Sequence, residues 1–262
     1  MKSIKRIIQK WSIALKILPL IILVTAFKFG THKFGFEVME LNALFSSLVA
    51  GTIFLIGFLI SGVLTDYKES EKLPSELAAV LRNLYDDTLT IHKGKDSVAA
   101  NEFIVFQRDF ISSLKDWFYK KAKIKVLLDK LSSMNDYFIA LEKEGIQANY
   151  IIKMKNEQNN IRRMIMRIDT IRDTEFVGSA YAIVEAMGFL TVFGLLIIRI
   201  EPYYASLFLT LLITFLISYM FLLIKDLDNP FDYAGNGETG TEIPLKPIHD
   251  FAAIVTEPLE YS

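Results

Sequence analysis

Apolar residues along this chain gather in four segments, each long enough to cross a bilayer as a helix. The hydrocarbon core of a membrane requires about 20 apolar residues in a helix. The four segments are 13–29, 41–65, 176–198 and 202–224. The second and fourth carry no charge, the third is interrupted only by Glu185, and the first contains Lys16 and Lys28, whose side chains can reach the interface. No small-residue cleavage site follows the first segment, so we expect a retained span and not a signal peptide.

Lysine and arginine are distributed unevenly among the connections, which predicts an orientation. The segment 66–175 holds 19 basic residues, and the chain before the first span holds four more. The other two connections are short, and acidic residues balance their basic ones. Because basic residues stay on the cytosolic side, we expect both termini and the large insert in the cytosol. The abundance of Ile and Lys favours a bacterial source, and hence the bacterial inner membrane.

The insert between the second and third spans has apolar residues at helical spacing. Leu77, Leu81 and Leu84 form one such stripe, and a loop is expected at 92–97, around Gly94. Basic and acidic residues are almost balanced there, which is typical of a solvated helical bundle. We therefore predict an all-α membrane protein. Its parts are 1–65 (N-terminal segment and spans one and two), 66–175 (cytosolic helical domain), 176–225 (spans three and four) and 226–262 (cytosolic tail).

Composition removes several classes of function. The net charge is −1, so nothing favours a nucleic-acid partner, and the chain has no cysteine and only three well-separated histidines. The sequence contains no nucleophile elbow, no zinc pair on a helix and no phosphate-binding loop. We therefore predict no catalytic residue, no metal site and no cofactor, and we do not expect an enzyme.

The second span has a distinctive face. Gly51, Phe54, Phe58 and Gly62 fall close to one side at helical spacing. Phenylalanine rings one turn apart could form an apolar constriction that gates an ion path by dewetting, if copies of this face met around an axis. The alternative is ordinary contact with lipid or a neighbouring helix. Gly51, Gly57 and Gly62 are candidate pivots for opening, or else serve helix contact only.

Glu185 is an ionisable residue within the third span. Such residues are costly in a bilayer and mark functional sites by default. The alternative is that Glu185 lies near enough to the cytosolic end of its span to reach a wet cavity. The two interpretations are compatible if that cavity belongs to an ion path.

A resemblance to a known family adds to this picture. The segment 56–84 reads IGFLISGVLTDYKESEKLPSELAAVLRNL, and Asn229-Pro230-Phe231 follows the fourth span. Both resemble the bestrophin family, as does the order of spans and insert. The resemblance implies a four-span subunit of a homopentamer that passes small anions or cations through a pore lined by the second span. The apolar neck of the family corresponds to Ala50, Phe54 and Phe58.

Two functions from different classes follow. The first is a bestrophin-like oligomeric channel for small ions, such as chloride or a monovalent cation, whose partners are its own copies, membrane lipid and the permeating ions. The second is a non-conducting scaffold or sensor that binds a partner through its cytosolic helices. A ring of subunits with Phe54 and Phe58 on its axis would favour the first function. Side chains of Phe54 and Phe58 that face lipid would favour the second.

Overall fold

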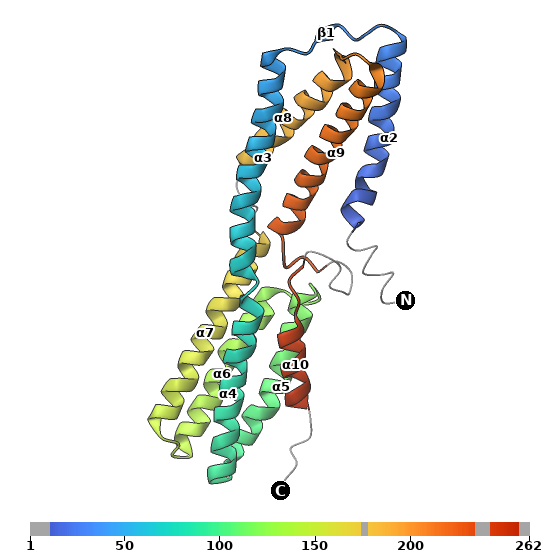
Figure 1. Cartoon of the computed structure of the whole chain (residues 1–262). Coiled ribbons are helices and arrows are strands. Elements are labelled where there is room, and N and C mark those ends of the chain that lie inside the picture. Colours follow the sequence, from blue (N-terminus) through green and yellow to red (C-terminus); the bar gives the residue numbers. More distant parts are fainter. Residues whose placement is uncertain (1–10, 174–177, 234–241, 257–262) are drawn as a thin grey trace. The chain divides into compact units, whose positions relative to one another are not determined.

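The computed structural model describes residues 11–173, 178–233 and 242–256. These residues form helices almost throughout, with two short strands (Figure 1). The chain divides into two compact units, which are treated separately below. The first comprises the described residues of 1–67 and 175–229, and the second those of 68–174 and 230–262.

Four long apolar helices make up the first unit. They are α2 (Ser12–Lys33), α3 (Ala43–Ser70), α8 (Gly178–Ile197) and α9 (Tyr203–Asp228). Each lies in a stretch long and apolar enough to cross a membrane, so the four predicted spans coincide with helices. The first two residues of the predicted third span, 176 and 177, lie outside the described part.

A two-residue parallel ladder joins the connections between these helices. Strand β1 (Met39–Glu40) pairs with β2 (Ile198–Arg199), so Met39 lies opposite Ile198. Strand β1 ends three residues before the start of α3, and β2 directly follows α8 in the chain. Backbone pairing therefore fixes the ends of two apolar helices in register with each other.

The second unit is a helical bundle. Its helices are α4 (Leu73–Lys95), α5 (Val98–Phe118), α6 (Ile124–Lys143), α7 (Ala148–Asp173) and the short α10 (Lys246–Thr256). Of the four long helices, α4, α5 and α6 each pack on the next one in the chain, and α7 also packs on α4. Leu77 and Leu84 of the predicted stripe are fully buried, which confirms the helical interpretation of their spacing. The tail helix α10 packs on α4 and α5 of its own chain.

Local sequence explains how the bundle helices begin and end. Pro74 lies in the first turn of α4, where its missing N–H is no loss. The predicted loop at 92–97 is too long, because α4 continues through Gly94 to Lys95 and is followed by the C-cap residue Asp96, which has a left-handed backbone. The hydroxyl of Ser97 then caps α5 by accepting the backbone N–H of Ala100 at 3.0 Å. Hence the turn contains two residues instead of six.

Candidate functional site: the exposed face of α3

Helix α3 has one packed face and one exposed face within its unit. Its packed face presents Ile56, Leu59 and Val63, which are almost fully buried in a core with side chains of α8 and α9. The exposed face contains Phe54 and Phe58, with 70% and 74% of their surface accessible, and Ala50 is exposed as well. The three candidate neck residues therefore lie on one face of α3, away from the rest of their own chain.

Two of the three candidate pivots lie where their own chain makes no close contact. A Cβ atom added at Gly51 or Gly57 would meet no heavy atom within 4 Å, and Gly62 is half-buried. Contact with another helix of the same chain therefore does not explain Gly51 or Gly57. The close approaches occur instead on α8. A Cβ at Gly194 would lie 2.3 Å from the ring of Phe45, and one at Gly188 would lie 3.2 Å from Ile217.

Glu185 of α8 has a partner on the neighbouring span. Its carboxylate accepts a hydrogen bond from Lys225 of α9 at 3.2 Å, and the Lys225 ammonium lies 4.6 Å from the centre of the Phe221 ring. Both charged side chains are about half exposed. The sequence did not reveal this pair, because the partners lie 40 residues apart. The available signal was an acidic residue inside the third span and a lysine directly after the fourth.

A second group of charges surrounds the connection between α2 and α3. Lys28 is completely buried, lies 2.8 Å from Glu37 and donates to the carbonyl of Ile198 at 2.7 Å. His32 bonds the other Glu37 oxygen at 2.8 Å, and its ring stacks on Tyr203. Burial acts to raise the pKa of Glu37, but hydrogen bonds from Lys28 and His32 outweigh it and lower that pKa. This cluster joins the start of α9 to the end of α2.

The Asn229-Pro230-Phe231 motif follows α9. Asn229 is half-buried, whereas Pro230 and Phe231 are buried in the second unit. The carbonyl of Pro230 accepts the backbone N–H of Ile243 at 3.0 Å, and the Tyr233 hydroxyl donates to the Ile243 carbonyl at 2.8 Å. Pro230 and Phe231 therefore help to seat the tail in the bundle.

Acidic and histidine side chains do not converge into a metal site within the described ranges, where no three of them come together as ligands. The charges near the spans occur instead as ion pairs, such as Lys28 with Glu37 and Lys225 with Glu185.

Comparison with known proteins identifies the fold. The sequence matches no protein-family model and no curated protein. Among solved structures, the chain is similar to a bacterial bestrophin homologue from Klebsiella pneumoniae. One variant of that protein matches with a TM-score of 0.76 and 16% identity over 92% of this chain and 97% of the other. A second structure of the homologue gives a TM-score of 0.74 and 15% identity over 92% and 97%.

The fold and the four apolar helices define the class: this is an all-α integral membrane protein with four spans and a helical domain inserted between the second and third. Its fold is bestrophin-like, over more than nine-tenths of the chain. The resemblance first visible in two short motifs thus holds at the level of the fold.

Proposed function

We propose that this chain is one subunit of an oligomeric ion channel, and that the exposed face of α3 lines its central pore. The observation that carries the proposal is the position of Phe54 and Phe58, on the side of α3 opposite to its packed face. A helix that lines a pore in a ring of subunits must pack outward on its own bundle and leave its other face to the axis. The bestrophin-like fold supports the same arrangement.

In a homopentamer, five copies of Phe54 and Phe58 would form two stacked rings of aromatic side chains, with Ala50 one turn away from Phe54. A narrow apolar constriction excludes water, and without water a small ion cannot cross it. Rotation or bending of α3 at Gly51, Gly57 and Gly62 would widen this neck. Gly51 and Gly57 are suited to the role because neither is held by a close neighbour in its own chain.

Selectivity between small anions and monovalent cations would arise outside the neck. The neck residues carry no charge, and the exposed hydroxyls nearest them on α3 belong to Ser47 and Ser61. Charges near the ends of the pore would therefore decide the sign of the permeating ion. The positive-inside pattern favours both termini in the cytosol, with the subunit in a bacterial inner membrane.

The decisive experiment compares three forms of the protein in a planar bilayer under a potassium chloride gradient. These are the wild type, the double variant Phe54→Ala, Phe58→Ala, and the matched double variant Phe189→Ala, Phe193→Ala. The matched pair is also exposed and lies one turn apart, but on α8. We expect a several-fold larger current in the α3 variant and wild-type current in the α8 variant. The reversal potential will assign anion or cation preference.

Two results would contradict the proposal. Equal effects of the α3 and α8 substitutions would remove the special role of α3. Silence in all three forms would support a non-conducting scaffold or sensor, provided that the particle mass shows an intact assembly. That mass is expected at five times the 29.9 kDa of one chain, in addition to bound detergent.

A further inference from the structure

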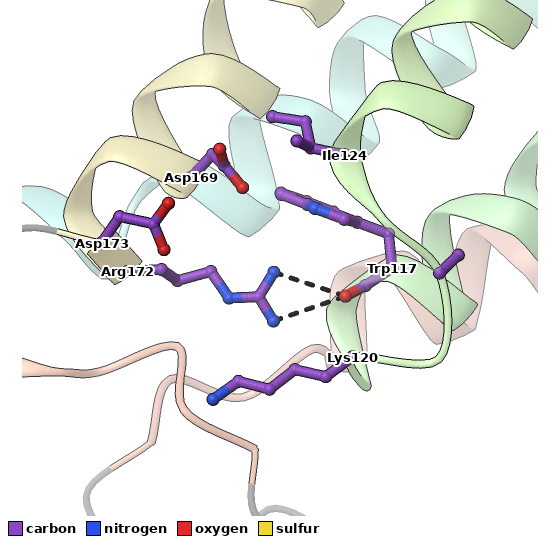
Figure 2. A pocket seen from close by; sticks show the side chains of 7 residues that line it. Trp117, Lys120, Ile124, Asp169, Arg172 and Asp173 are labelled. Carbon is purple, nitrogen blue, oxygen red and sulfur yellow. Dashed lines mark hydrogen bonds between the residues drawn. The ribbon is translucent and has the colours of Figure 1, made fainter.

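A pocket of about 220 Å³ lies in the second unit, where the α5–α6 turn meets the last turns of α7 (Figure 2). It is lined by Trp117, Lys120, Ala122, Ile124, Asp169, Arg172 and Asp173. Two of these side chains are acidic and two are basic, so the lining has no net charge but offers groups of both signs. The pocket belongs to none of the features assigned to the pore.

Arg172 occupies the middle of this pocket in a fixed position. Its guanidinium donates to the carbonyl of Trp117 at 3.3 Å and to that of Phe118 at 2.9 Å, and it lies 5.0 Å from the centre of the Trp117 ring. Three independent contacts hold the group before any ligand arrives. Such preorganisation reduces the entropy lost when a ligand binds.

The charges of opposite sign lie on different sides of Arg172. Figure 2 shows Asp169 and Asp173 on one side of the guanidinium and Lys120 on the other. Lys120 is half exposed and forms an ion pair with Asp232 at the surface. Burial, together with the charge of Asp173, raises the pKa of Asp169, although the charge of Arg172 and a hydrogen bond from Trp117 act to lower it. A second cationic group, placed between the two carboxylates, would relieve the repulsion that remains.

The lining residues adjoin the membrane-spanning helices along the chain. Asp173 is five residues before Gly178, where α8 begins, and Asp232 is four residues after Asp228, where α9 ends. The pocket residue Asp173 is therefore close in sequence to α8, and Asp232, the ion-pair partner of Lys120, is close in sequence to α9.

We propose that this pocket binds a zwitterion in which a primary ammonium is joined by a short linker to a phosphate. The ammonium donates to Asp169 and Asp173, while the phosphate accepts from Arg172 and Lys120. A guanidinium and an ammonium that converge from two elements match the several acceptor oxygens of a phosphate. A soluble phosphoethanolamine and a phosphatidylethanolamine headgroup share this chemistry.

Fluorescence of Trp117 gives a direct test. The chain has only two tryptophans, so the full-length Trp11→Phe variant reports on the pocket alone. In a maltoside detergent, titration with phosphoethanolamine should produce a saturable change in the Trp117 emission. Phosphate alone and ethanolamine alone should each bind at least tenfold more weakly. Nanodiscs with and without phosphatidylethanolamine then distinguish the sources, since headgroup occupancy requires the emission to differ between them.

Substitutions in the same Trp11→Phe background decide whether the pocket residues carry the binding. Asp173→Asn and Lys120→Met change exposed side chains and should preserve the fold, and each should weaken phosphoethanolamine binding by about tenfold. The control is Asp86→Asn, a half-exposed carboxylate of α4 that pairs with Arg82. The proposal is overturned if neither free phosphoethanolamine nor the lipid changes the emission, if both pocket variants bind like Asp86→Asn, or if either half of the ligand binds as tightly as the whole.

Discussion

At the scale of single residues, the burial of the Lys28 ammonium has a direct consequence for stability. A lysine ammonium inside a protein is stable only with partners, and Lys28 has the Glu37 carboxylate and the Ile198 carbonyl. The two charges also connect α2 to the loop that follows it. The sequence suggested that the Lys28 side chain reaches the interface, whereas it is completely buried, and the pairing with Glu37 was not predicted because each residue alone looks like an ordinary charge near the end of a span.

Removal of one member of this pair should destabilise the protein strongly. Lys28→Met leaves the Glu37 carboxylate largely buried without its closest cation, which should cost roughly 3 kcal/mol. Thermal melting in detergent measures the loss as a lower midpoint. The double variant Lys28→Met, Glu37→Met should recover most of the midpoint, because it leaves no uncompensated charge. Lys33→Met, at an exposed position two residues before the loop residue Gly35, should melt like the wild type.

The Glu37 carboxylate also makes the stability of the protein depend on pH. Its pKa in the folded protein is lower than the ordinary value of about 4.3, so the fold favours the ionised form. This stabilisation is complete above the unfolded pKa and is lost as the pH falls through the folded pKa. We expect the wild-type melting midpoint to drop between pH 5 and pH 3 by more than that of Glu37→Gln. A Glu40→Gln variant, changed at an exposed site, should keep the wild-type slope.

At the scale of elements, we expect a methyl group added at a glycine to have opposite effects on α8 and α3. Gly188 and Gly194 of α8 have close neighbours, whereas Gly51 and Gly57 of α3 have none. Gly194→Ala forces the buried Phe45 ring to move, since the new Cβ would lie 2.3 Å from it. Overpacking of this kind costs about 1–3 kcal/mol. We expect a lower melting midpoint, restored in part by Phe45→Leu in the same chain. Gly51→Ala, which meets open space in its own chain, should raise the midpoint slightly, because alanine favours a helix interior over glycine.

The orientation of α3 can be tested residue by residue because the chain contains no cysteine. Single cysteines at Ala50, Phe54 and Phe58 should react with a charged thiosulfonate reagent during recording, and the current should fall. Cysteines at Ile56 and Leu59 face the core and should not react. Reaction at all five positions, or only at the last two, would show that the exposed face of α3 does not line the water-filled path.

Much of the element structure could be predicted from the sequence, and the reasons for the exceptions are physical. Hydropathy locates spans because lipid selects on mean apolarity over a whole helix. The exposed face of α3 followed from spacing together with the bestrophin resemblance. In contrast, the Glu185–Lys225 pair and the pocket beside Arg172 depend on which helices become neighbours. In a domain with almost equal numbers of basic and acidic residues, charge alone cannot identify the few that converge.

At the scale of the whole molecule, the positive-inside pattern and the even number of spans predict where each part lies relative to the membrane. Cysteine labelling in intact cells provides the test. Val38→Cys is exposed between α2 and α3, and Gln147→Cys is exposed between α6 and α7. A membrane-impermeant maleimide should label the first in intact cells and the second only after permeabilisation. Labelling of Gln147→Cys alone in intact cells would invert the orientation. The charges that select the permeating ion would then have to be sought at opposite ends of the pore, because the bundle would face the outside.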